Sequence, residues 1–306
     1  MNKSKNFFIK KIPIGIFLAC LFVTAALVYS LGHHMAMKKF NDIVSYTQEK
    51  QKMYSKLSEV DYNIRENYIG EIDDDKLIDG ACSGYINGVN DQNCRFLSAA
   101  DYKSYKDEIE NLPGEVSVQV LNDDVALLNC SRFGAGFSEN FIDALNSLIS
   151  SGIQKIAVDL RGVSGGVEEE AFKVLEYIAP EGDIVKTVDS SGESEVVCSS
   201  SGKGISAKFV ILTDKTTSGL AEVFTEALKF FRDAKHVGVT TAGNAVREKS
   251  VVFSDNSAMI IPDAFYVVSD EKKFFKSGVV PDIDISGKSL NEDELLDEVV
   301  RCFEEE

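Results

Sequence analysis

The sequence lacks most of the short motifs that bind a cofactor or a metal. It contains no phosphate-binding P-loop, no glycine-rich dinucleotide fingerprint and no HExxH motif. Its six cysteines form neither a CxxC pair nor a zinc-ligand spacing. Histidine is scarce too, with only His33, His34 and His236 present. We therefore predict no cofactor and no metal.

Basic charge is also in short supply. The net charge is −17, from 49 acidic residues against 32 lysines and arginines. All the acidic residues follow residue 31, whereas four lysines precede residue 12, so the rest of the chain is more acidic still. Such a surface repels phosphate backbones and anionic lipid headgroups, which argues against nucleic acid as a partner.

One long apolar run is present. Residues 12–31 form a nearly unbroken apolar stretch without charge, long enough to span a bilayer, and Lys3, Lys5, Lys10 and Lys11 precede it. The positive-inside rule then predicts a single-pass anchor with a cytoplasmic N-terminus and an extracytoplasmic C-terminal domain. A cleaved signal peptide is the alternative. The run is long for a signal peptide, and its end lacks a small-x-small cleavage site.

Beyond the apolar run, residues 33–60 are polar and favour a helix, because no glycine or proline lies between Met35 and Tyr68. From residue 116 onward, strand and helix patterns alternate, which predicts an α/β core with right-handed crossovers. The expected strands are 116–120, 125–128, 156–160 and 209–212, and the expected helices 139–151, 168–178 and 220–232. A hairpin is expected at 183–188 and 195–198.

Three blocks of sequence stand out within this core. The first, 156–166, is a buried-strand pattern that runs into a glycine turn; the second, 209–222, reads as strand, turn and helix start; the third is 277–283. Together they resemble the C-terminal-processing (tail-specific) serine peptidases over residues 57 to 285. The resemblance implies a spiral core like those of the ClpP and crotonase folds, a serine nucleophile and a lysine general base.

The two catalytic positions implied by the resemblance hold other residues. The family serine lies three residues before a glutamate, and counting back from Glu222 leads to Gly219. The family lysine position falls on Asn244, in a turn after the strand end at Val239, without any gap in the spacing. An amide takes up no proton near neutral pH, so Asn244 is not a base. We expect no intact catalytic pair.

Ser218 is the best remaining nucleophile candidate, one position from the family site. A one-residue shift on a helix turns the side chain by about 100°, so we favour a role for Ser218 as the helix N-cap. A base is hard to find as well. Lys215 and Lys249 do not hold the family position, and His236 has no paired aspartate pattern.

Two other family features have changed. The glycine turn Gly165–Gly166 is expected to be a remnant of the oxyanion hole, although the residues before it are Val163 and Ser164 instead of the family's Asn–Pro. The PDZ domain of most relatives has no room before the strand at 125–128. Helical N-terminal dimer elements in bacterial relatives suggest a homodimer through the N-terminal helix, with a simple stalk as the alternative.

The predicted organisation has five parts: a cytoplasmic segment 1–11, an anchor 12–31, a helical stalk and helical region 33–112, an α/β core 113–290 without a PDZ domain, and an acidic terminal helix 291–306. We expect a catalytically inactive relative that binds a peptide or protein ligand. The alternative is an active serine-type endopeptidase that uses Ser218 with a non-standard base.

Overall fold

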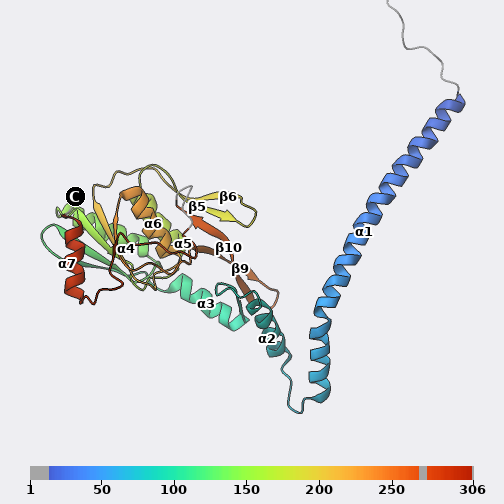
Figure 1. The fold of residues 1–306 in the computed structure, drawn as a ribbon, viewed down its shortest axis with the longest axis horizontal. Helices are drawn as coiled ribbons and strands as arrows, with labels where there is room; N and C mark the ends of the chain where they lie inside the picture. The colour runs from blue at the N-terminus through green and yellow to red at the C-terminus, as the bar shows by residue number, and fades with distance from the viewer. Residues whose placement is uncertain (1–13, 269–273, 305–306) are drawn as a thin grey trace, which may run out of the picture. The chain divides into compact units, whose positions relative to one another are not determined.

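The computed structural model describes residues 14–268 and 274–304, so the predicted cytoplasmic segment 1–11 lies outside the described residues. The chain divides into two compact units, Met1–Asp74 and Asp75–Glu306. Figure 1 shows the single long helix of the first unit and the strands and helices of the second. Each unit is described by itself.

The first unit consists of one helix, α1 (Ile14–Asn67). The predicted anchor and the predicted polar helix after it are thus one continuous helix. Its part from Ile14 to Phe40 is long and apolar enough to cross a membrane, a property that an anchor shares with a signal sequence. Apolar side chains such as Phe22, Val28 and Tyr29 are more than two-thirds exposed there.

The core of the second unit is a six-stranded sheet in the order β11-β8-β7-β4-β3-β2. Only the edge pair β2–β3 is antiparallel; the other neighbours run parallel, as alternating strands and helices predict. The strands are β2 (Val116–Val120), β3 (Val125–Cys130), β4 (Lys155–Asp159), β7 (Lys208–Thr213), β8 (Lys235–Gly238) and β11 (Ile283–Asp284).

The second sheet is antiparallel. Its order is β1-β10-β5-β6, and β9 pairs with β10. Its strands are β1 (Arg95–Leu97), β5 (Gly182–Asp189), β6 (Ser194–Ser200), β9 (Val246–Val252) and β10 (Ala258–Val267). β5 and β6 form the predicted hairpin, with its turn at residues 190–193.

Helices cover both faces of the six-stranded sheet. α4 (Phe137–Ser150), α5 (Glu168–Ile178) and α6 (Leu220–Arg232) pack on one face, where Ala126 and Leu128 of β3 point. The alternate residues Val125 and Leu127 point to the other face and pack with α7 (Glu292–Cys302). The predicted helices 168–178 and 220–232 have the observed bounds, and 139–151 is shifted by one or two residues.

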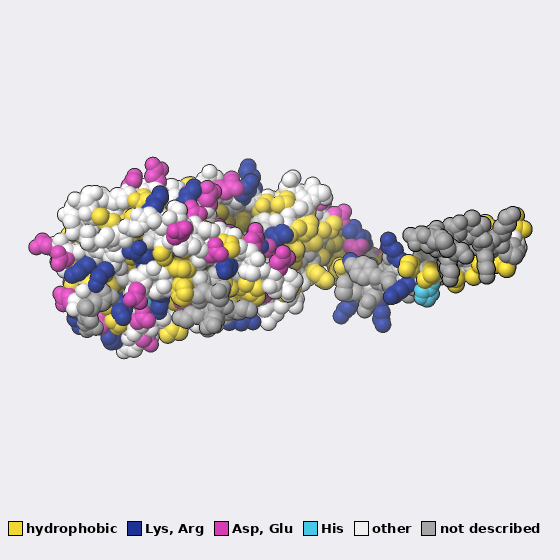
Figure 2. All heavy atoms as spheres, turned by 90° about the horizontal axis from the view of Figure 1, so that it is seen from above, with side chains coloured by type: hydrophobic (Ala, Val, Ile, Leu, Met, Phe, Trp, Pro, Cys, Tyr) yellow, Lys and Arg dark blue, Asp and Glu magenta, His cyan; other side chains and the backbone are white. Residues whose placement is uncertain are grey.

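The predicted terminal helix within 291–306 is α7, and its apolar residues Leu295 and Val299 are buried against the sheet. The region 33–112 holds the end of α1 together with α2 (Asp74–Asn87) and α3 (Ala99–Asn111), and α2 and α3 belong to the second unit apart from Asp74. The four residues 112–115 link α3 directly to β2. On the face shown in Figure 2, acidic and basic side chains of this unit are interspersed.

Candidate functional site

The site forms at the carboxyl ends of two neighbouring parallel strands, β4 and β7, where α/β proteins commonly bind ligands. The turn after β4 carries Gly165 and Gly166, and the turn after β7 leads into α6. The two turns are hydrogen-bonded to each other. The Ser218 N–H donates to the Val163 carbonyl at 3.0 Å, and the Gly165 N–H donates to the Ser218 carbonyl at 3.3 Å.

Asp214 and Thr217 fix the turn after β7. One oxygen of Asp214 accepts from the backbone N–H groups of Thr216 and Thr217, and from that of Gly162 in the first turn. The buried Thr217 hydroxyl donates to the Leu160 carbonyl at 2.9 Å. These bonds, made at the ends of β4 and β7, fix the course of the chain into α6.

Gly219 is the N-cap of α6, so the prediction that Ser218 caps this helix is wrong. Gly219 has φ 60° and ψ −124°, a conformation that residues with a Cβ rarely adopt and that costs them about 1–3 kcal/mol. A Cβ built there would lie 3.3 Å from the Gly165 nitrogen. A side chain at Gly219 would therefore start directly beside the glycine turn.

The buried carboxylate of Glu222, on the first turn of α6, joins this turn to the one that carries Asn244. One oxygen accepts from the Gly219 N–H at 3.0 Å and the Asn244 N–H at 2.6 Å. The other accepts from the Gly243 N–H at 2.6 Å and the Thr241 hydroxyl. Because Gly219 and Asn244 share one acceptor oxygen, their amide nitrogens lie no more than about 6 Å apart. The positions assigned to the family serine and lysine are thus side by side.

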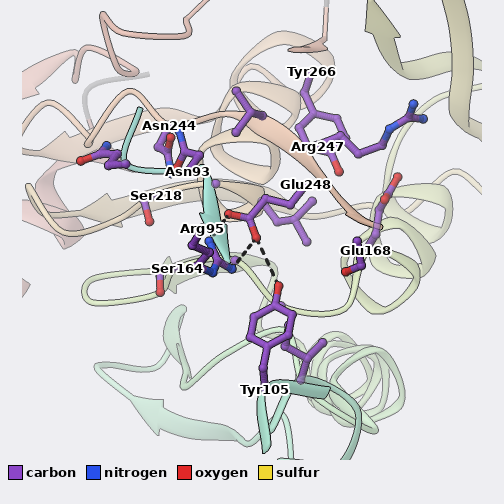
Figure 3. A pocket seen from close by; sticks show the side chains of 18 of the residues that line it. Asn93, Arg95, Tyr105, Ser164, Glu168, Ser218, Asn244, Arg247, Glu248 and Tyr266 are labelled. Atoms are coloured by element: carbon purple, nitrogen blue, oxygen red, sulfur yellow. Dashed lines mark hydrogen bonds and ion pairs between the residues drawn. The ribbon is translucent and has the colours of Figure 1, made fainter. Parts of the chain in front are cut away.

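Gly219 and Asn244 line one end of a groove of about 620 Å³, together with Gly165, Gly166 and Ser218. Figure 3 shows Asn244, Asn93, Ser218 and Ser164 at this end. Further groove residues come from five elements, β1, α3, α5, β9 and β10: Arg95, Tyr105, Lys106, Glu110, Glu168, Arg247, Glu248 and Tyr266.

An ion pair crosses the middle of the groove. Arg95 of β1 donates to both oxygens of Glu248 of β9, at 3.0 and 2.8 Å. The Tyr105 hydroxyl, from α3, donates to the same carboxylate at 3.2 Å, and the Arg95 guanidinium lies 5.0 Å from the Tyr105 ring centroid. The hydrogen bond to Glu248 raises the pKa of Arg95. This network links α3 to β1 and β9 of the second sheet (Figure 3).

The far end of the groove carries Glu168, Arg247 and Tyr266. Desolvation raises the pKa of Glu168, and the nearby Tyr266 hydroxyl and the charge of Arg247 offset part of this rise. Arg247 is itself paired with Asp263 at 2.9 Å and with Glu195 at 3.4 Å. Neither this end nor the central ion pair was predicted from the sequence, because no local motif marks residues that come together only through the two sheets.

The candidate bases lie elsewhere. Lys215, Lys249 and His236 are not among the residues that line the groove. His236 is fully buried on β8, where its Nε2 lies 2.6 Å from the Thr213 hydroxyl oxygen. That hydroxyl donates to the Val239 carbonyl, so Nε2 donates and Nδ1 is left without a hydrogen-bond partner. Burial, with the nearby charge of Lys229, lowers the pKa of His236 to about 4.

Comparison with known proteins decides the family. The model of peptidase family S41 matches residues 124–285, more than half of the chain. The chain belongs to peptidase family S41. The match covers the strands and helices that build the Gly165 and Gly219 turns and the Asn244 turn, so this end of the groove lies within the matched residues. Arg95, Tyr105 and the other groove residues of β1 and α3 lie before them.

Two curated S41 relatives illustrate the extent of the similarity. The "Probable CtpA-like serine protease" of Staphylococcus aureus (strain N315) is 27% identical over 164 residues, covering 53% of this chain and 33% of the relative. The chain thus spans about a third of that relative's length. The carboxy-terminal processing protease CtpA of Bacillus subtilis (strain 168) is 21% identical over 318 residues, covering 75% and 68%.

Solved structures support the S41 fold. The photosystem II D1 C-terminal processing protease superposes with a TM-score of 0.53 at 23% identity, over 62% of this chain and 52% of that one. A lipoprotein from Streptococcus agalactiae superposes with a TM-score of 0.61 at 14% identity, over 74% and 82%. The expected α/β fold is therefore confirmed.

The first prediction concerns Glu222. We expect Glu222→Gln to lower the free energy of unfolding by about 2–4 kcal/mol, because an amide offers one acceptor oxygen where four donors now share two. Urea denaturation of the full-length protein in detergent, followed by circular dichroism, measures it.

A matched control exists in α7. Glu294 accepts from the backbone of its N-cap Asn291 as Glu222 does from Gly219, but it is exposed and makes that bond alone. Glu294→Gln should cost less than about 1 kcal/mol. Equal losses in the two variants would contradict the special role of Glu222.

The second prediction concerns pH. The folded-state pKa of His236 is lowered to about 4, so as pH falls the unfolded chain takes up this proton first. The corresponding stability is complete above pH ~6.5 and is lost between pH ~6.5 and ~4, by up to about 3 kcal/mol. His236→Asn should remove this part of the pH dependence in urea titrations. A variant whose stability falls as steeply as that of the wild type would refute the assignment.

Proposed function

We propose that this protein is a membrane-anchored, extracytoplasmic member of family S41 that binds a peptide or protein segment in its groove without hydrolysing it. The proposal rests on the residue at the start of α6. By the resemblance, the family's serine nucleophile belongs in this turn, and this chain has Gly219 there. The curated relatives named above are described as proteases. We propose that this chain has a similar groove but does not carry out their hydrolytic reaction.

The lack of a nucleophile and of a base supports inactivity. A Ser–Lys hydrolase needs a hydroxyl beside an amine that can take its proton. Gly219 and Asn244 offer neither, although their backbones are held together by Glu222. Among the described residues that line the groove, the one lysine is Lys106, and it lies 3.6 Å from the carboxylate of Glu110 on its own helix. Ser218 therefore has no neighbouring neutral amine to activate it.

The groove itself supports binding. Its size is that of a small-ligand or peptide-side-chain site, and its walls combine backbone amides, aromatic rings and charged side chains. Gly166 has no room for a Cβ, because the Phe133 carbonyl oxygen lies 2.5 Å from where it would be placed. Glycine at this position therefore lets the turn pack closely against the backbone of Phe133.

The third prediction tests catalysis. We expect the full-length protein to show no peptidase activity above background on casein or on peptides, and no labelling by a fluorophosphonate probe. Ser218→Ala should behave in the same way. Turnover by the parent protein that disappears in Ser218→Ala, or probe labelling at Ser218, would overturn the proposal.

Restoring the pair provides the positive control. Gly219→Ser with Asn244→Lys places a hydroxyl and an amine on turns whose amides share one carboxylate oxygen. We expect partial turnover in this double variant and none in either single variant. The gain is partial because Val163–Ser164 has replaced the family's residues before the glycine turn. The new serine also has to adopt the strained conformation of Gly219, at a cost of about 1–3 kcal/mol.

The anchor is part of the same proposal. The apolar stretch Ile14–Phe40 and the four lysines before residue 12 support a single pass with the N-terminus in the cytoplasm. We also predict that the part of α1 beyond this stretch mediates a homodimer.

The fourth prediction tests this topology. Protease added to intact protoplasts should remove the Asp75–Glu306 unit and leave a short membrane-bound fragment, because the cleavable chain lies outside the cell. Protoplasts permeabilised with detergent serve as the control for access. A mature protein that starts near Gly32 and is found free in the medium would show a cleaved signal peptide instead.

A further inference from the structure

The groove has a chemically distinct far end at Glu168. Three glutamates begin α5, and each has a different environment. Glu170 accepts from the backbone N–H and the hydroxyl of Ser138 at 2.8 Å, which ties α5 to the start of α4. Glu169 points to solvent and pairs with Lys173 one turn along. Glu168 alone lines the groove, with Tyr266 and Arg247 beside it in Figure 3.

The charges around Glu168 do not balance. The nearby charged groups are Arg247 of β9, Asp263 of β10 and Glu195 of β6, and the neutral Tyr266 hydroxyl lies beside them. Arg247 already binds Asp263 through two nitrogens and lies within 3.4 Å of Glu195. Among the residues that the structure describes, three carboxylates thus face one cation, Arg247, and Arg247 is oriented toward the other two.

The other groove charges are matched. Arg95 pairs with Glu248, and Lys106 with Glu110. The negative excess therefore lies around the Glu168 end, where Asp263 and Glu195 behind the groove add to the Glu168 carboxylate, which is itself partly desolvated by burial. Desolvation of an unpaired carboxylate is unfavourable, and a cation brought into the groove would relieve it.

We propose that the Glu168 end of the groove receives a lysine or arginine side chain of the bound peptide segment, with its cation on the Glu168 carboxylate. This inference rests on the proposed peptide-binding function and names the ligand class. An anionic ligand does not fit, because Arg95 and Arg247 already carry carboxylate partners. A metal ion does not fit either, since no group of three or more metal-ligating side chains is found among the described residues.

Peptide chemistry also suits the rest of the groove. From Glu168 the groove continues past the aromatic ring of Tyr105 to the glycine turn and the start of α6, so the long apolar stem of a lysine has an aromatic surface to lie on. The strongly acidic chain raises the local concentration of basic segments before they dock.

The experiment uses the full-length protein in nanodiscs of zwitterionic lipid, which do not themselves retain basic peptides. An array of acetylated, amidated decapeptides of random sequence is printed in pairs, with every lysine of one member replaced by norleucine in the other. We expect bound peptides to be enriched in lysine over norleucine. Soluble peptides chosen from the array are then measured by fluorescence polarisation.

Glu168→Gln and Glu169→Gln form a matched pair, because each removes one negative charge from the first turn of α5. We expect Glu168→Gln to weaken lysine peptides about fivefold, the upper end for one partly exposed charge pair, and to leave norleucine peptides unchanged. Glu169→Gln should change either class by less than about twofold. Circular dichroism verifies that both variants are folded.

The outcomes separate the two proposals. If no peptide of either class binds the wild type, the proposed function itself fails. If peptides bind without a lysine preference, or if the two variants weaken lysine peptides equally, the peptide-binding function stands and the assignment of Glu168 is overturned. Equal weakening would show that the attraction comes from the net charge of the chain.

Discussion

The carboxylate of Glu222 accepts four hydrogen bonds inside the protein, and the arrangement of the site depends on it. Its donors belong to two turns, one at the start of α6 and one after β8, which are more than twenty residues apart in the sequence. A buried charge is tolerated only when its lone pairs are satisfied, so the two turns are held in one relative position. The same carboxylate caps the start of α6 through the Gly219 N–H.

Gly219 lies in the turn that Glu222 holds in place at the start of α6. A nucleophile placed there would need a strained backbone, and the strain would have to be compensated by the surrounding structure. Glycine adopts the same φ and ψ without that cost. Glycine at this position therefore fits the shape of the turn without backbone strain.

The groove depends on segments that are far apart in the sequence. α3, the strand-end turns of the six-stranded sheet, and β1, β9 and β10 of the antiparallel sheet line it. The ion pair of Arg95 with Glu248 joins β1 to β9, the two strands that flank β10 in that sheet. Among the described residues that line the groove, each charged side chain except Glu168 forms an ion pair. The two ends of the groove therefore differ: backbone amides lie at one end, and the Glu168 carboxylate lies at the other.

The sequence by itself determined the α/β fold class and most element bounds, because these follow from local periodicity, turn residues and three blocks that resemble one family. The assignment of Gly219 and Asn244 to the family's catalytic positions, from a gap-free spacing, stays a prediction. The sequence also indicated the apolar stretch of α1. Tertiary structure alone decided that Gly219, and not Ser218, caps α6, because the cap depends on how the turn crosses Val163 and Gly165. It alone decided that α7 joins the core and that Arg95, Glu168 and Glu248 line one groove. Such contacts arise from sheet pairing between distant strands, which leaves no local pattern in the sequence.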